Sequence, residues 1–323
     1  MFKNSYVLPI SKNEGVYDME VIMRNMFQSI GKNPSANKLA KKYGLRLGAT
    51  RFVAGDTIKT AINAVKKLNA EGKVATLDHL GEFVFTKEEA NESASMCIAT
   101  LDAIAQSSVQ SNLSLKMTSL GLDISRELCV ANMKRILDRA KMYGNFVRID
   151  MEDYAHAQVT IDIFKELKEI YGDHVGLVIQ AYLYRTENDM NEMNAYKANL
   201  RLVKGAYKES SEVAFPEKAD VDVNFIKCIE AHLLNGNYTA IATHDPKIIA
   251  QTKELVNKFH ISKDLFEFQM LYGICVDLQN QLVKEGYKVR IYVPYGIDWF
   301  GYFMRRLAER PANVWFVLKN FFK

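Results

Sequence analysis

Short apolar segments alternate with longer amphipathic segments from about residue 74 onward. The short segments are rich in β-branched residues and almost continuously apolar, which is typical of parallel strands buried on both faces. They occur at residues 74–77, 112–115, 146–149, 175–179, 200–203, 239–242, 265–268 and 289–292. Each is followed by a segment with helical periodicity, so the pattern predicts a series of strand–helix units.

The amphipathic segments predict the helices and their ends. They cover residues 87–109, 123–143, 155–171, 186–198, 221–234, 246–259, 272–285 and 299–310. Asp245 before Pro246 is typical of an N-cap followed by proline in the first turn. Gly172 stands where one of the helices should stop. Ahead of the first strand, three further segments have helical character, at residues 18–30, 34–43 and 54–69.

Eight strands, each followed by a helix, predict an α/β fold of the (β/α)8 TIM-type barrel. An open, doubly wound sheet is the alternative, and it is disfavoured because no break in composition divides the chain. We expect residues 71–323 to form the barrel. We expect residues 1–70 to form additional N-terminal helices packed on the barrel, not a separate domain.

Composition and charge limit the classes of function. The chain has 323 residues, of which 48% are hydrophobic and 25% charged, as in ordinary globular proteins. The net charge of +4 is dispersed along the chain, so we expect no nucleic-acid partner. No apolar run reaches the roughly 20 residues of a membrane helix, and no signal peptide is read at the start. The four widely spaced cysteines are typical of a reduced, cytoplasmic protein.

Polar groups close nearly every predicted strand. In a (β/α)8 barrel the active site lies at these carboxyl ends. Taken singly, an aspartate there is more often a helix N-cap, a histidine is more often a hydrogen-bonded structural residue, and a lysine can extend to solvent. Their joint occurrence at one rim favours a catalytic mouth. The residues are Asp78, Lys116, Asp150, Gln180, Lys204, His244, Gln269 and Tyr292.

The final predicted helix carries a second cluster of charge. Tyr302 lies three and four residues before Arg305 and Arg306, so the three side chains share one face near the helix start. Two adjacent guanidinium groups can bind one carboxylate or phosphate, which predicts a small anionic substrate. The alternative is a solvated amphipathic face on which Glu309 pairs with an arginine.

Several common site motifs are missing from the chain. There is no G-x-G-x-x-G after a strand, no P-loop, no H-E-x-x-H helix and no G-x-S-x-G elbow, so a Rossmann site, a metal site and a serine nucleophile are not expected. Lys204 and Gly205 after the fifth strand suit the approach of a phosphate group. These residues leave open a phosphorylated cofactor or a substrate bound as a Schiff base.

Three segments carry a resemblance to a known family: residues 201–207 (RLVKGAY), 292–296 (YVPYG) and 302–309 (YFMRRLAE). Shorter matches in the same order stand at most of the other strands, from about residue 74 to 310. The chain resembles the proline dehydrogenases, in particular the monofunctional bacterial enzymes. The resemblance implies a distorted (β/α)8 barrel, bound FAD, and oxidation of L-proline to 1-pyrroline-5-carboxylate by hydride transfer to the flavin.

The resemblance also implies roles for individual residues. It places Asp150 beside the substrate pocket and Arg201 near the reactive ring nitrogen of the flavin. The substrate-binding residues it implies are Lys116, Arg305 and Arg306 as a carboxylate clamp, with Leu271, Tyr292 and Tyr302 as pocket walls. The FAD contacts it implies are Met151, Gln180, Arg201, Lys204, Gly205, Ala206, Thr243 and His244. Glu82 is implied to pair with a clamp arginine and to gate the pocket.

The proton and electron acceptors are less defined. Either Asp150 or solvent would take the proton of the substrate amine. The resemblance implies a membrane quinone as electron acceptor, and the apolar residues 314–323 either contact a bilayer surface or, the interpretation we favour, pack across the barrel. Lys208 stands where some relatives carry tryptophan, so that flavin contact does not carry over.

Two other functions share the fold and the charged rim. One is a Schiff-base lyase with Lys116 or Lys204 as the amine, and the other is a non-catalytic barrel that binds a small acidic metabolite. Only the first hypothesis, proline oxidation, requires a flavin.

Overall fold

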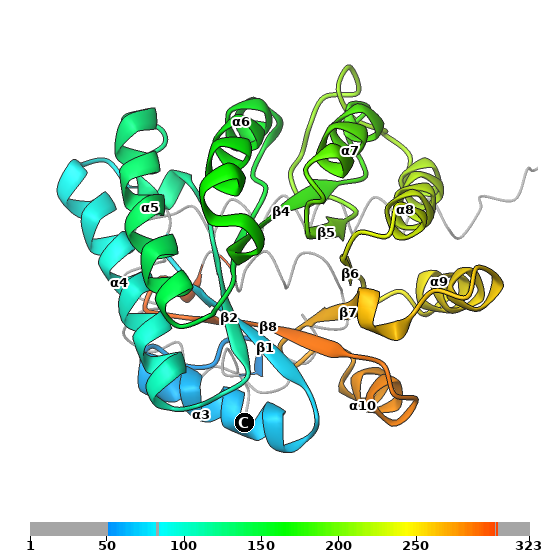
Figure 1. Ribbon diagram of the computed structural model, residues 1–323, viewed down its shortest axis with the longest axis horizontal. Coiled ribbons are helices and arrows are strands. Elements are labelled where there is room, and N and C mark those ends of the chain that lie inside the picture. The colour runs from blue at the N-terminus through cyan, green and yellow to red at the C-terminus, as the bar shows by residue number, and fades with distance from the viewer. Residues whose placement is uncertain (1–50, 82–83, 301, 303–323) are drawn as a thin grey trace, which may run out of the picture. The chain divides into compact units, whose positions relative to one another are not determined.

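The computed structural model describes residues 51–81, 84–300 and 302, and its strands form a closed barrel (Figure 1). Neighbouring strands are parallel, and the first pairs with the last, so the barrel closes in chain order. The predicted (β/α)8 fold is confirmed. The strands are β1 (Val74–His79), β2 (Ser111–Leu115), β3 (Val147–Ile149), β4 (Val175–Gln180), β5 (Leu200–Val203), β6 (Thr239–Ala242), β7 (Phe266–Leu271) and β8 (Val289–Tyr295).

Helices surround the strands on the outside of the barrel (Figure 1). They are α3 (Ile58–Ala70), α4 (Lys87–Gln106), α5 (Arg126–Met142), α6 (Tyr154–Tyr171), α7 (Thr186–Ala195), α8 (Lys218–Leu234), α9 (Pro246–Lys258) and α10 (Val276–Lys284). The start of α9 is as predicted, because the Asp245 side chain accepts from the Lys247 N–H at 3.0 Å and Pro246 opens the helix. In contrast, α10 begins four residues later than predicted, after a turn in which Gly273 and Cys275 have positive φ.

The last two strands are longer than their sequence pattern predicts. β7 runs on to Leu271 and β8 runs on to Tyr295. Pro294 does not end β8, and its carbonyl oxygen accepts from the Ala54 N–H at 2.9 Å. As a result Gln269 and Tyr292, expected at strand ends, lie within strands, where their side chains meet those of neighbouring strands.

The chain divides into two compact units, residues 52–297 and residues 1–51 together with 298–323. The first unit holds the whole barrel and also α3, which packs against β1 and β8. The helices predicted at residues 18–30 and 34–43 lie outside the described residues. Of the helix predicted at 299–310, the described residues Trp299, Phe300 and Tyr302 are helical.

Candidate active site

Charged residues interrupt four of the strands in the same way. Arg148, Arg201, Glu267 and Arg290 each stand between two buried apolar residues. Side chains alternate between the two faces of a strand, so the apolar neighbours pack against the helices and the charged residues enter the barrel. Buried charge is costly unless it is paired, and these side chains form hydrogen bonds from strand to strand.

The Glu267 carboxylate is fully engaged. Its Oε1 accepts from Arg290 Nε at 2.7 Å and from Gln269 Nε2 at 2.5 Å, and its Oε2 accepts from the Tyr238 hydroxyl at 2.9 Å. Burial raises the pKa of Glu267, but Arg290 and these hydrogen bonds outweigh burial and lower the pKa to about 2. Glu267 is therefore ionised and acts only as an acceptor.

Arg201 is held at two of its three nitrogens. Its Nε donates to Gln269 Oε1 at 2.6 Å, and its Nη1 donates to Asp150 Oδ1 at 2.5 Å and to Ser114 Oγ at 3.1 Å. The Tyr292 ring covers the guanidinium, with its centroid 5.2 Å from Cζ.

The third nitrogen of Arg201, Nη2, is buried and has no hydrogen-bond partner among the described residues. The Arg201 residue as a whole is only 4% exposed, so water does not freely replace the missing acceptor. A buried donor left without an acceptor costs about 1–3 kcal/mol, and more when it is charged. This nitrogen therefore marks a place where a bound molecule would present an acceptor.

Tyr292 lies between two carboxyl groups. Its hydroxyl oxygen is 2.6 Å from Asp78 Oδ2 and 2.8 Å from Asp150 Oδ2. One hydroxyl proton can serve only one of these contacts, so the other requires a proton on a carboxyl group. Burial raises the pKa of Asp78 despite the attraction of Lys116. When Asp78 holds that proton, it donates to Tyr292, and Tyr292 donates to Asp150.

Lys116 completes this network at the end of β2. Its Nζ lies 3.3 Å from Asp78 Oδ2, and the side chain is 23% exposed. Burial lowers the pKa of Lys116, but the attraction of Asp78 and Asp150 outweighs burial, so the pKa is raised and the ammonium stays charged. A charged group that is partly open and loosely paired is suited to bind an external anion.

Two of the predicted cofactor contacts lie buried next to β3 and β4. Met151 follows β3, and Gln180 ends β4 with its Nε2 donating to the Glu152 carbonyl oxygen at 2.8 Å. Glu152 in turn accepts from the Thr118 N–H and hydroxyl, while burial raises its pKa. The loop after β3 is thus tied to its neighbours at the same end of the barrel as Asp150.

The ends of β6 and β7 are joined by a histidine. His244 Nε2 accepts from the Leu271 N–H at 2.9 Å, and the Thr243 hydroxyl accepts from the Asp245 N–H at 3.1 Å. Thr243 and His244, both predicted to contact the cofactor, therefore lie next to Leu271, which was predicted to form a pocket wall.

The segment after β5 has the geometry of a close backbone approach. Gly205 has a φ of +120°, and a Cβ placed there would lie 2.2 Å from the Tyr182 ring. Ala206 beside it is exposed. Lys204 is already paired, with Asp222 at 2.5 Å and Asp245 at 3.3 Å. Its charge is thus largely compensated within the protein, which the sequence did not reveal.

Three predicted substrate residues and the predicted gate residue are not placed with this network. Glu82, Arg305 and Arg306 lie outside the described residues, and Tyr302 belongs to the other unit. The predicted residues that the structure does bring together are Lys116, Asp150, Arg201 and Tyr292.

Other members of the network were not singled out from the sequence. They are Ser114, Tyr238, Glu267 and Arg290, while Asp78 and Gln269 were noted only as strand ends. The signal that was available is the charged residue between two apolar ones at the centre of a predicted strand, as in residues 266–268 and 289–291. Such a residue cannot face the helices, so it must enter the barrel.

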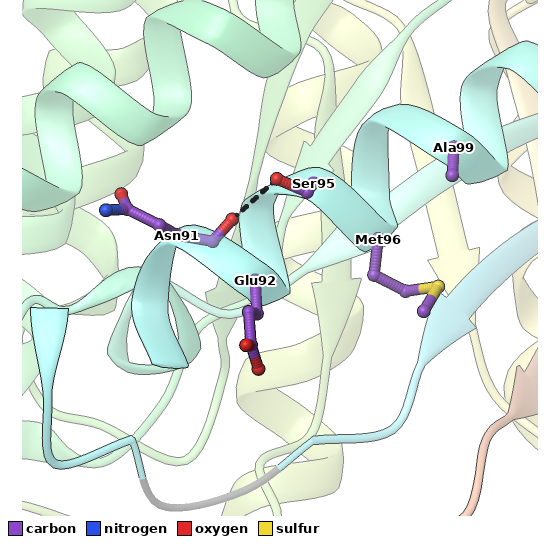
Figure 2. Close-up of a pocket in the computed structure, with 5 residues that line it drawn as sticks. All are labelled: Asn91, Glu92, Ser95, Met96 and Ala99. Atoms are coloured by element: carbon purple, nitrogen blue, oxygen red, sulfur yellow. Dashed lines mark hydrogen bonds between the residues drawn. The ribbon is translucent and has the colours of Figure 1, made fainter. Parts of the chain in front are cut away.

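A shallow hollow elsewhere on the barrel does not coincide with this network. Its volume is about 470 Å³. Its lining residues all come from α4 (Figure 2). Among them, Ser95 Oγ donates to the Asn91 carbonyl oxygen, which is an internal helix contact. The lining residues are Asn91, Glu92, Ser95, Met96 and Ala99. Nothing in this lining matches the charge and burial found at the strand ends.

Two kinds of feature are absent from the described residues. In residues 51–81, 84–300 and 302, no group of three or more His, Cys, Asp or Glu side chains is arranged to hold a metal ion. Within the same ranges no helix is long and apolar enough to span a membrane.

A closed barrel with a buried, partly unsatisfied charge network at its strand ends is the arrangement of a (β/α)8 enzyme. The family model described as "Proline dehydrogenase" matches residues 61–319 of the chain. Proline dehydrogenase 1 of Bacillus subtilis (strain 168) is 53% identical over 302 residues, covering 94% of this chain and 100% of that protein. Proline dehydrogenase of Deinococcus radiodurans is 42% identical over 309 residues, covering 94% and 99%. The chain belongs to the proline dehydrogenase family.

Solved structures agree with the family at the level of the fold. The crystal structure of proline utilization A (PutA) from Bdellovibrio bacteriovorus, inactivated by N-propargylglycine, superposes with a TM-score of 0.79 at 25% identity. The match covers 92% of this chain and 37% of that one, so this chain spans about a third of the larger protein.

Proposed function

We propose that this protein oxidises L-proline to 1-pyrroline-5-carboxylate, the first step of proline breakdown to glutamate, with FAD as the hydride acceptor. Membership of the proline dehydrogenase family supports an enzyme that oxidises proline. The observation that carries the FAD part is the Nη2 atom of Arg201, a buried cationic donor with no acceptor in the described part of the chain. The isoalloxazine ring offers nitrogen and oxygen acceptors of the kind that this donor requires.

The residues present also fit the rest of a flavin nucleotide. Gly205 has a φ of +120°, which is suited to glycine, and its lack of a Cβ lets the backbone after β5 pass against the Tyr182 ring. Met151, Gln180, Thr243 and His244 lie at the carboxyl ends of β3, β4 and β6 and would line the cofactor in this proposal. When bound, FAD would supply the two-electron acceptor that no amino-acid side chain provides.

The protein's own residues would position the substrate and its charges. In our proposal Lys116, Arg305 and Arg306 bind the proline carboxylate, and Leu271, Tyr292 and Tyr302 form the walls around the ring. Fixing the carboxylate orients the ring carbon that loses hydride, a positioning effect that can contribute several kcal/mol. Glu82 would pair with a clamp arginine and gate the pocket.

Asp150 is better suited to hold its neighbours than to take the substrate proton. Both of its carboxylate oxygens already accept hydrogen bonds, Oδ1 from Arg201 and Ser114 and Oδ2 from Tyr292. It thereby fixes the guanidinium and one pocket wall. The substrate amine must lose its proton before hydride leaves. Because both oxygens of Asp150 are occupied, we assign that proton to solvent.

Electrons would then pass to a membrane quinone, with the protein on the cytoplasmic side of the membrane as a peripheral partner. The apolar residues 314–323 would supply the surface for that contact in the alternative to packing across the barrel, which is the interpretation we favour. Deleting residues 311–323 should abolish flotation of the protein with liposomes. Unchanged flotation of a folded truncated protein would contradict the membrane contact.

The absorbance of the purified protein tests the proposed function. Flavin absorption that is bleached by L-proline in the absence of oxygen is the expected result. A colourless protein that sodium borohydride links covalently to an aldehyde substrate would instead establish a Schiff-base lyase. A colourless protein that binds an acidic metabolite without turnover would establish a binding barrel.

A further inference from the structure

Gln269 joins the two ends of the buried network. Its Nε2 donates to Glu267 Oε1 at 2.5 Å, and its Oε1 accepts from Arg201 Nε at 2.6 Å. The residue is 4% exposed, so the amide has few other partners to choose from. Its role is not obvious from its chemistry, since an amide neither carries charge nor exchanges protons at neutral pH.

The orientation of this amide is determined by Glu267. Glu267 is ionised through its ion pair with Arg290, so it accepts hydrogen bonds and donates none. The Gln269 atom that faces it must therefore be the amino group. The amide carbonyl oxygen then faces Arg201 and accepts the single hydrogen that Arg201 Nε carries.

A fixed Nε contact determines which edge of the guanidinium remains open. With Nε on Gln269 and Nη1 on Asp150 and Ser114, two edges of the planar fork are occupied, and only the Nη2 hydrogens stay without an acceptor among the described residues. The Tyr292 ring covers one face of the plane and opposes tilting.

We propose that Gln269 is a positioning residue, oriented by Glu267 and Arg290, that turns the Nη2 edge of Arg201 toward the flavin. The inference rests on the proposed function, because it assumes that FAD supplies the acceptor. A guanidinium held in this way stabilises negative charge on the reduced ring and costs no reorganisation when the flavin is reduced.

Substitution of Gln269 by methionine tests this role. Met has a similar volume but neither accepts from Arg201 nor donates to Glu267. We expect the Kd for FAD, measured by equilibrium dialysis of the full-length protein, to rise about tenfold, as for one hydrogen bond to a charged group. We expect the equilibrium between oxidised and reduced bound flavin to shift about tenfold toward the oxidised form, a midpoint potential about 30 mV more negative.

Two further variants separate positioning from packing. In Gln269→Glu the new carboxyl shares a proton with Glu267, donates to it and still accepts from Arg201, so affinity and potential should stay within about threefold of wild type. Gln279→Met is the matched control. Gln279 is equally buried but donates to the carbonyl oxygens of Leu271 and Ile274, and its loss should leave the potential unchanged.

The outcomes distinguish the inference from the proposed function. A wild-type protein that binds no flavin would overturn the proposed function and the inference with it. A wild-type protein that binds flavin, together with Gln269→Met of unchanged Kd and potential, would overturn the inference alone. Equal shifts in Gln269→Met and Gln279→Met would also overturn it, because loss of any buried amide would then have the same effect.

Discussion

The interior of the barrel contains one hydrogen-bonded network with two different ends. At one end Glu267 accepts hydrogen bonds from Arg290, Gln269 and Tyr238, so both of its carboxylate oxygens have partners. At the other end Arg201 Nη2 has no partner in the described residues, and Lys116 reaches its partner only at 3.3 Å. Both ends are charged, and both include a buried residue inside a strand, Glu267 at one end and Arg201 at the other.

The difference between the two ends separates structure from function. A saturated buried ion pair has no hydrogen-bonding group left for a ligand, so it acts on stability and, in our proposal, on the site only indirectly through Gln269. A buried charged group with an unsatisfied donor, as at Arg201 Nη2, can still bind an acceptor that the described residues do not supply. The two ends are similar in charge and differ in whether each nitrogen and oxygen atom has a hydrogen-bond partner.

The largest expected effect is on stability, at the saturated end. Glu267→Gln would leave Arg290, whose side chain is only 15% exposed, without a counter-charge, so we expect the free energy of unfolding to fall by about 3–5 kcal/mol. Urea denaturation followed by circular dichroism measures this change. Glu285→Gln is the control, because the Glu285–Lys253 ion pair lies near the surface and should contribute less than about 1 kcal/mol. Similar losses in the two variants would remove the distinction drawn above.

The next effect is on activity, at the open end. Arg201→Lys keeps a positive charge, but an ammonium cannot bond to Gln269, to Asp150 and to a bound ring in one plane. We expect kcat/KM for proline to fall about 10²–10³-fold, as when one preorganised donor is removed from a catalytic site. The free energy of unfolding should fall by less than in Glu267→Gln. A larger loss of stability than of activity would place Arg201 with the structural end.

Much of the fold was predictable because strands and helices differ in the period of their apolar residues. All eight strand segments and the cap of α9 at Asp245 are where the sequence places them. The site was predictable only in part. Lys116 and Asp150 follow their strands, so position alone identified them, and Arg201 came from the family resemblance. Glu267 and Arg290 were missed because both lie mid-strand, where apolar residues are expected, and only the closed barrel creates an interior in which they can pair.

A smaller effect is expected at the rim. Lys116→Met removes a charge that, in our proposal, binds the proline carboxylate, so KM for proline should rise about 10–100-fold while kcat changes less. Steady-state kinetics over a range of proline concentrations measures both. Lys165→Met is the matched control, since Lys165 pairs with Asp162 and Glu192 on the outside of the barrel and should leave KM unchanged. An unchanged KM in Lys116→Met would remove Lys116 from the substrate clamp.

The smallest expected effect concerns the extra proton on Asp78. Because burial raises its pKa above the unfolded value of about 3.9, the folded protein binds this proton more tightly, and the acid form favours the fold. Wild-type stability should therefore fall, relative to Asp78→Asn, as pH rises from about 4 through the folded-state pKa of Asp78. Each tenfold difference in proton affinity contributes about 1.4 kcal/mol.

Urea denaturation of both proteins at a series of pH values measures this difference. Asp173→Asn provides a control of opposite sign, because the hydrogen bond and charge of Lys168 lower the pKa of Asp173, so its contribution is lost as pH falls. If the Asp78→Asn and wild-type curves ran parallel at all pH values, Asp78 would be ionised in the folded protein. The Tyr292 hydroxyl would then have only one proton for its contacts with two carboxylates. The positive charge of Lys116 would be compensated by Asp78 instead of being available to a substrate.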